Sequence, residues 1–200
     1  MPEAPEPSLK GQTFVCGLSF ALVCVAAQGL DVAGMALQFQ RLAWAQGAWW
    51  QLFTSQWVHL SWGHWLGNVL GFVIVWAGLR LRLPARSLLL VHGGGLLGVM
   101  AVLLWDTQCQ YYAGASGALH GLGAGGGALL LLGVSRGWGV ACSVLLAAKL
   151  VVPWIWPGAT VSTYDFPVYH PAHVAGALGG LLMALLVSGA HAPSETSKSQ

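Results

Sequence analysis

A series of long apolar stretches limits the fold of this chain more than any other feature. An α-helix needs about 20 apolar residues to cross the roughly 30 Å hydrocarbon core of a bilayer. Stretches of this length occupy residues 12–30, 57–79, 87–105, 114–134, 138–156 and 170–189, and the longest connection between them is residues 31–56. Because a helix satisfies its own backbone hydrogen bonds in lipid, the sequence predicts an all-α membrane protein with six transmembrane helices.

The composition agrees with a bilayer environment. Only 7% of the 200 residues are charged and 56% are hydrophobic, whereas about a quarter of the residues of a soluble domain are charged. The chain has no Lys/Arg-rich patch of the kind that binds nucleic acid, so the lipid bilayer is the expected partner and nucleic acid is not. The four cysteines lack CxxC spacing, which indicates buried structural thiols and neither a zinc nor a redox site.

The polar ends suggest a simple domain organisation. Residues 1–11 are expected to form a polar tail, 12–189 the membrane domain and 190–200 a disordered tail. Glu3 and Glu6 before the first apolar stretch argue against a cleaved signal peptide, so this stretch is expected to be a retained helix. Basic residues gather at the two ends of the chain and in the connections after the second and fourth stretches: Lys10, Arg80, Arg82, Arg86, Arg136 and Lys198. The connections after the first, third and fifth stretches hold one basic residue, Arg41. The positive-inside rule therefore predicts that both termini are cytoplasmic and that residues 31–56 lie on the outer side.

Three polar groupings interrupt the apolar stretches at the predicted outer half of the membrane. Polar side chains inside a bilayer are costly and usually face the interior of a helix bundle, so these groupings are expected to form one site. The segments are HLSWGHWLGN, with His59, His64 and Asn68; GASGALH, with Ser116 and His120; and HPAHVAGALGG, with His170 and His173.

These residue types fit nucleophilic acyl transfer. A serine hydroxyl becomes a nucleophile when a neighbouring base takes its proton, and histidine is the usual base near neutral pH. The six stretches contain no carboxylate, which predicts a dyad of Ser116 and His173 and disfavours a Ser-His-Asp triad. The side chains of His64 and Asn68 and the backbone N–H of Ser116 would stabilise the oxyanion. No metal or other cofactor is expected.

Glycines recur at helical spacing beside these residues. Small residues let helix backbones approach closely in lipid, so the fourth and sixth helices are expected to touch and to bring Ser116 near His173. The glycines concerned are Gly114, Gly117, Gly121 and Gly125 in the fourth stretch, and Gly176 and Gly180 in the sixth.

The three segments resemble the GxSG, HxxxxHxxxN and HxxGxxxG motifs of the rhomboid intramembrane serine proteases, in the same order, over residues 50–185. The resemblance implies that Ser116 is the nucleophile, His173 the general base, and His64 with Asn68 the oxyanion-stabilising pair. It further implies that His59 is a structural or water-relay residue. The chain departs from the family at His120, where many bacterial members have a tyrosine, and at Trp50–Gln51, where the family often has Trp-Arg.

The form GASGALHG and the short chain are similar to the rhombosortase branch of this family. That similarity implies a multi-pass protein of a Gram-negative bacterial inner membrane, with its active site toward the periplasm. It implies substrates with a C-terminal sorting tail: a glycine-rich motif, one transmembrane helix and a basic cluster, cleaved at or near Gly-Gly. The alternative within the family is a generic rhomboid protease that cuts other single-span membrane proteins.

Other readings remain open on the residues alone. A histidine-rich metal transporter would use the five histidines of the three segments, but it would leave Ser116 and Asn68 without a role. A pseudoenzyme would bind membrane helices without cutting them. The acyl-enzyme could be resolved by water or by an amine or alcohol of a lipid headgroup. Lys149 is expected either to snorkel toward an interface or to contact substrate, and Tyr164 with Asp165 could shape a lid.

Overall fold

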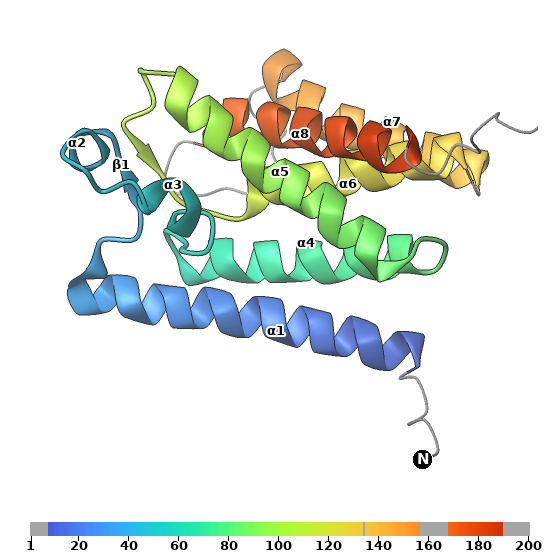
Figure 1. The fold of residues 1–200 in the computed structure, drawn as a ribbon, viewed down its shortest axis with the longest axis horizontal. Coiled ribbons are helices and arrows are strands. Elements are labelled where there is room, and N and C mark those ends of the chain that lie inside the picture. Colours follow the sequence, from blue (N-terminus) through green and yellow to red (C-terminus); the bar gives the residue numbers. More distant parts are fainter. Residues whose placement is uncertain (1–7, 134, 157–167, 190–200) are drawn as a thin grey trace, which may run out of the picture.

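A computed structural model describes residues 8–133, 135–156 and 168–189. Six long helices form one bundle (Figure 1). They are α1 (Leu9–Leu30), α4 (Trp62–Arg80), α5 (Ala85–Trp105), α6 (Ser116–Leu132), α7 (Arg136–Ile155) and α8 (His170–Gly189). Five of them are long and apolar enough to cross a membrane, and α6 is a shorter apolar helix. The prediction of an all-α, six-helix membrane bundle is therefore confirmed.

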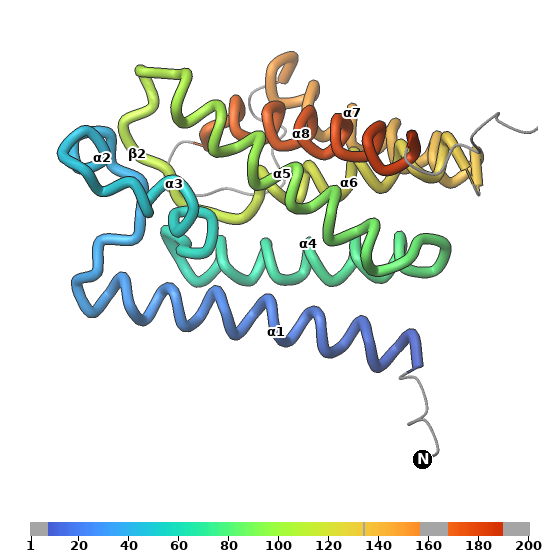
Figure 2. The backbone as a smooth tube through the Cα atoms, viewed as in Figure 1, coloured from blue at the N-terminus to red at the C-terminus, as the bar shows by residue number. Residues whose placement is uncertain are grey.

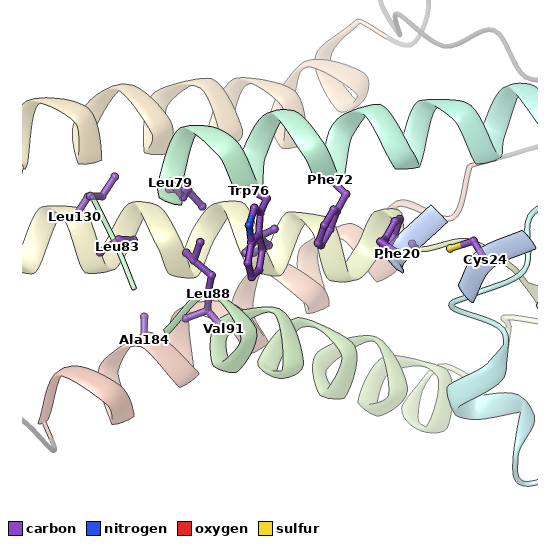
Figure 3. Packing of buried hydrophobic residues seen from close by; sticks show 12 residues of the cluster. Phe20, Cys24, Phe72, Trp76, Leu79, Leu83, Leu88, Val91, Leu130 and Ala184 are labelled. Carbon is purple, nitrogen blue, oxygen red and sulfur yellow. The ribbon is translucent and has the colours of Figure 1, made fainter. Parts of the chain in front are cut away.

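Helix α6 occupies the middle of the bundle. It contacts α4, α5, α7 and α8, while α1 packs against α4 on the outside (Figure 2). Aromatic side chains hold α1 to α4: the rings of Phe20 and Phe72 stack with centroids 4.3 Å apart, and Phe72 stacks in turn on Trp76. Figure 3 shows these three rings in a row, with Leu88 and Val91 close to Trp76. This packing holds α1 against α4, and α4, which carries His64 and Asn68, contacts α6 in turn.

Two helices begin later than the sequence predicted. The second long helix starts at Trp62 and not at residue 57, because Ser61 adopts an extended conformation and its hydroxyl caps the helix by accepting from the N–H of His64 (3.1 Å). His59 therefore lies in the loop before α4. Helix α6 starts at Ser116 and not at 114, since Gly114 has a φ of 126°, a left-handed conformation that a helix cannot include.

The segment between α1 and α4 forms a compact cap at one end of the bundle. It contains a π-helical turn (Asp31–Met35), strand β1 (Phe39–Gln40), and the short helices α2 (Arg41–Ala45) and α3 (Gln51–Thr54). Strand β1 pairs antiparallel with β2 (Tyr111–Tyr112), just before α6. We call this end of the bundle the cap end; the α4–α5 and α6–α7 connections lie at the opposite end (Figure 1).

The cap is organised by Gln51, at the place where the family often has an arginine. Gln51 is completely buried. Its Oε1 accepts from the N–H of Gln40 (3.0 Å) and its Nε2 donates to the carbonyl of Ala36 (2.9 Å). A neutral amide thus ties three parts of the cap without a salt bridge.

Some predicted segments lie outside the described residues: 1–7 of the N-terminal tail, the C-terminal tail 190–200, and Tyr164 with Asp165. Residues 9–11, expected in the N-terminal tail, belong to α1, because the hydroxyl of Ser8 accepts from the N–H of Gly11 (3.2 Å) and caps the helix there. The four cysteines are free thiols, with Cys24 and Cys109 buried and Cys16 and Cys142 half-buried.

Candidate active site

The site centres on a hydrogen bond between Ser116 and His173. Ser116 is the first residue of α6 and His173 lies in the first turn of α8. Their Oγ and Nε2 atoms are 2.8 Å apart. A neutral imidazole whose Nε2 lacks a proton can accept the hydroxyl hydrogen of the serine, which is the geometry that an activated nucleophile requires.

A glycine seam between α6 and α8 brings these two residues together. A β-carbon added to Gly176 would overlap the carbonyl oxygen of Gly117, and one added to Gly180 would overlap that of Gly121. The predicted contact between the fourth and sixth helices is therefore confirmed, and all the glycines expected to make it take part except Gly114, which lies against His64 of α4.

A second glycine contact, between α5 and α8, was not predicted from the sequence. A β-carbon on Gly94 would overlap the backbone of Gly179, and one on Gly98 would overlap the carbonyl of Ala175. The signal was present in the segment HGGGLLG, whose Gly94 and Gly98 are four residues apart and share one helix face. Helix α8 is thus held between α5 and α6 by backbone contacts on two sides.

His120 contacts both members of the dyad. Its Nδ1 lies 2.7 Å from the carbonyl oxygen of Ser116, and since a carbonyl only accepts, Nδ1 carries the proton. Its ring stacks on that of His173, with centroids 4.3 Å apart and planes 14° apart. The ring of His170 meets His173 edge-on, at 5.7 Å. His173 is thus enclosed by two other imidazoles.

His64 and Asn68 lie one turn apart on α4 and are both buried. A β-carbon on Gly114 would overlap the ring of His64, so the imidazole lies directly against the backbone two residues before Ser116. The His64 ring is also close enough to His173 for their charges to interact. Among the described residues, Nδ2 of Asn68 has no hydrogen-bond partner.

His59 lies behind His64. Its ring meets that of His64 edge-on, with centroids 5.0 Å apart, and its backbone N–H donates to Oε1 of Gln28 at 2.7 Å. Both of its ring nitrogens are buried, and the ring also interacts with the backbone of Trp57. His59 therefore belongs to the candidate site through its ring contact with His64.

Lys149 is the charged residue nearest the dyad on α7. Its side chain is exposed, yet its charge lies within electrostatic range of the rings of His120 and His173. His92, on α5, is buried and meets the rings of Phe20 and Phe72 edge-on, and its ring also interacts with the backbone of Ala118 on α6. Neither Lys149 nor His92 lies in one of the three motif segments.

The histidines do not converge as metal ligands do. In residues 8–133, 135–156 and 168–189, no three His, Cys, Asp or Glu side chains are grouped in a way that could hold an ion. The face-to-face stack of His120 on His173 points their nitrogens along the ring planes and not toward a common centre. The arrangement suits proton transfer between a serine and an imidazole.

The fold and the hydrogen-bonded serine and histidine define a membrane-embedded serine hydrolase. A family model described as the Rhomboid domain matches residues 46–190, so the chain belongs to the rhomboid family and is an intramembrane serine protease. It is also similar to a protein of Bacillus subtilis (strain 168) named "Putative rhomboid protease YdcA", with 27% identity over 146 residues that cover 71% of this chain and 69% of the relative. Rhomboid proteases act on transmembrane substrates within the bilayer.

Proposed function

We propose that this protease cleaves its substrates with a Ser116–His173 dyad, and that these substrates carry a glycine-rich C-terminal transmembrane tail. The observation that carries the dyad is the 2.8 Å distance between Ser116 Oγ and His173 Nε2. No step in the reaction needs a cofactor.

In the first step, Ser116 Oγ attacks the scissile carbonyl while its proton passes to Nε2 of His173. The C–N bond then breaks, and His173 returns the proton to the departing amine. In deacylation, water, or an amine or alcohol of a lipid headgroup, gives its proton to His173 and attacks the ester carbon. The bond from that carbon to Ser116 Oγ then breaks, and His173 returns the proton to Oγ. The histidine acts as base and then as acid in each half-reaction.

The oxyanion of the tetrahedral intermediate would receive hydrogen bonds from the backbone N–H of Ser116 and from the side chains of His64 and Asn68. The unpartnered Nδ2 of buried Asn68 supports this role. Loss of one such donor typically slows an enzyme by about 100- to 1,000-fold. Ala substitution of His64 or Asn68 should therefore slow cleavage without abolishing it.

The substrate proposal rests on the segment GASGALHG, with His120 stacked on the base, and on the physics of unwinding. A peptide bond inside a transmembrane helix is shielded from attack, so the helix must open first. Each glycine costs about 1 kcal/mol of helix stability relative to alanine. A Gly-Gly site below an exported domain is thus a weak point at which Ser116 could attack. Substrates that lack such a site are the alternative.

We further propose a location in a bacterial inner membrane with the cap end toward the periplasm. Arg80, Arg82, Arg86 and Arg136 belong to the end opposite the cap, and Arg41 is the cap's own basic residue. Basic residues remain preferentially in the cytoplasm. The proposed dyad would then face the side on which exported proteins are processed.

The dyad is tested by labelling the purified protein with a fluorophosphonate probe in the presence and absence of a chelator. Labelling should be lost in Ser116→Ala and should fall at least 1,000-fold in His173→Ala, with no effect of the chelator. Ser188→Ala, a change at the far end of α8, is the matched control and should label normally. Labelling that survives Ser116→Ala, or that the chelator abolishes, would contradict the dyad.

The substrate class is tested with two reporter proteins in vesicles, identical except that one carries Gly-Gly and the other Leu-Leu at the start of the transmembrane tail. The glycine reporter should be cut at least tenfold faster, with the new C-terminus at or beside Gly-Gly by mass spectrometry. Equal rates would favour a rhomboid protease without this preference.

A further inference from the structure

The glycine seam brings α8 close to α6. By itself, it does not fix the position of α8 along or around its own axis. Seams of this kind lack side chains that interlock, because Gly176 and Gly180 present only backbone to Gly117 and Gly121. At this seam, a shift of the first turn of α8 by about 1 Å would be opposed by backbone contacts alone. The same shift would lengthen the Oγ–Nε2 hydrogen bond, and a misplacement of this size can cost about 100-fold in rate.

A second contact, outside the helices, fixes the first turn of α8. Tyr169 directly precedes this helix, and its carbonyl accepts from the N–H of Ala172 (3.2 Å), which makes it part of the first turn. Its hydroxyl donates to Oδ2 of Asp106 at 2.5 Å. The hydrogen bond therefore ties the turn that carries His173 to the end of α5, 63 residues earlier in the chain.

The acceptor is itself held firmly. Asp106 caps the end of α5, where its N–H donates to the carbonyl of Val102 (2.8 Å). Its Oδ1 accepts from the N–H of Gln108 (2.9 Å), and its carbonyl accepts from Nη2 of Arg41 (2.6 Å). Arg41 also donates to the carbonyls of Leu103 (2.6 Å) and Cys109 (3.2 Å). The backbone of Asp106 is thus held by α5 and by Arg41 of the cap.

The same cluster reaches the serine side of the dyad. The ring of Tyr169 meets that of Tyr112 edge-on, with centroids 6.2 Å apart. The hydroxyl of Tyr112 is buried and donates to the carbonyl of Gly114 (2.8 Å), two residues before Ser116. Tyr169 therefore links the backbone before Ser116 to the turn before His173.

The charge state of the pair suits a strong contact. The hydroxyl of Tyr169, and then the N–H of Gln108, hold the pKa of Asp106 below its ordinary value. Burial and the bond to Asp106 raise the pKa of Tyr169. At neutral pH the phenol is therefore the donor and the carboxylate the acceptor, and such charge-assisted hydrogen bonds are about twice as strong as neutral ones.

We propose that Tyr169 and Asp106 are positioning residues of this protease, whose hydrogen bond holds the first turn of α8 so that His173 Nε2 stays within reach of Ser116 Oγ. The proposal rests on the Ser116–His173 dyad proposed above. Neither residue touches the reacting atoms; both act through the placement of His173.

The test measures how fast each active enzyme reacts with a fluorophosphonate probe. Tyr169→Phe and Asp106→Ala should each lower the maximal inactivation rate, kinact, about tenfold, because His173 spends less time at the right distance. The half-saturating probe concentration should change less than twofold. The final amount of labelled protein, which counts folded active sites, should equal that of the wild type.

Three further variants sharpen the test. The double variant Tyr169→Phe/Asp106→Ala should be no slower than either single variant, since both remove the same bond. Asp106→Asn keeps an oxygen acceptor and should recover part of the lost rate. Tyr111→Phe, at a neighbouring tyrosine that is 73% exposed, is the matched control and should react like the wild type.

Several results would overturn the inference. Unchanged kinact in Tyr169→Phe and Asp106→Ala would do so, as would additive losses in the double variant. A lower labelling endpoint with an unchanged kinact would show that the pair serves folding alone. If the wild-type chain showed no labelling that depends on Ser116, the dyad would fail and this inference with it; Ser116-dependent labelling with normal variants would overturn the inference only.

Discussion

His120 is the residue at which the site departs from many bacterial rhomboid proteases, which have a tyrosine four residues after the serine. Its two contacts, the Nδ1–H bond to the carbonyl of Ser116 and the stack on His173, are separable by substitution. A phenylalanine keeps an aromatic face for the stack but lacks the donor, whereas an alanine lacks both.

We therefore expect His120→Phe to lower the rate of fluorophosphonate labelling about three- to tenfold, the equivalent of one hydrogen bond. His120→Ala should lower it further, since a stacked aromatic pair contributes about 0.5–1.5 kcal/mol of its own. Labelling rates of the two variants and the wild type, measured side by side, check the order. If His120→Ala and His120→Phe reacted equally fast, the stack would have no role in placing His173.

Asp106 makes the stability of the protein sensitive to acid. Its pKa lies below the ordinary value of 3.8, first because Tyr169 donates to it. A carboxyl group with a lowered pKa in the folded state stabilises that state above its unfolded pKa, and this contribution is lost as the pH falls through the folded value. The nearby groups that carry or can carry charge are Arg41, Cys109 and Tyr169.

We expect the melting temperature of the wild type to fall as the pH drops below about 4, and that of Asp106→Asn to fall less over the same range. The chain contains only six Asp and Glu side chains, so the contribution of one of them to the pH dependence of the melting temperature is measurable. Thermal unfolding in detergent between pH 7 and 3 gives both curves. Parallel curves for the two proteins would mean that the Tyr169 bond does not depend on the charge of Asp106.

At the scale of helices, backbone contact between α6 and α8 brings the two helices that carry Ser116 and His173 together. Gly180 has no room for a side chain, because its β-carbon would overlap the carbonyl, carbonyl carbon and α-carbon of Gly121. Those atoms belong to a buried helix and cannot rotate away as a side chain could. Gly78, on the exposed face of α4, has no atom within 4 Å of the corresponding position, which makes it a matched control.

Gly180→Ala should destabilise the protein by about 1–3 kcal/mol, the usual effect of overpacking, and should also slow labelling of Ser116 by moving His173. Gly78→Ala should leave labelling unchanged and stabilise α4 by up to about 1 kcal/mol. Thermal unfolding and labelling rates report the two effects. A normal labelling rate in Gly180→Ala would indicate that α8 can move without disturbing the dyad.

The sequence predicts the long helices well because a single property, about 20 apolar residues, defines them. Their first residues are less predictable. The start of α4 depends on the cap by Ser61, and that of α6 on the left-handed Gly114, neither of which changes the hydropathy. The cap elements escape prediction because they are short and depend on distant partners: β1 pairs with β2, and Arg41 bonds to the end of α5.

Across the whole molecule, the residues of the candidate site could be predicted because their motifs lie on helices that small residues bring together. Ser116 and His173 meet where the glycine spacing indicated, and His64 of α4 lies against Gly114. The Tyr169–Asp106 bond could not be predicted, since nothing in either local sequence marks a partner 63 residues away. Lys149 stays unexplained for a related reason: its relation to His120 and His173 depends on how α7 packs beside α6.

The orientation of the bundle is a property of the whole chain, and it decides which compartment receives the product. Four arginines, Arg80, Arg82, Arg86 and Arg136, belong to the connections at the end opposite the cap or to the first turns beside them. Translocating these four charges would cost far more than translocating Arg41, the single basic residue of residues 31–56. The cap end is therefore expected on the outer side, with both termini in the cytoplasm.

Single cysteines placed at the two ends test this orientation in a variant whose four native cysteines are replaced by serine or alanine. Thr107→Cys lies at the exposed turn after α5, at the cap end, and Ser135→Cys directly precedes α7 at the other end. A membrane-impermeant maleimide added to intact spheroplasts should label Thr107→Cys and should label Ser135→Cys only after the membrane is opened. The reverse pattern would place the Ser116–His173 pair toward the cytoplasm, where it could not process the outer part of an exported protein. Because both variants carry the same replaced cysteines, a difference between them reports the side of the membrane and not the loss of a native thiol.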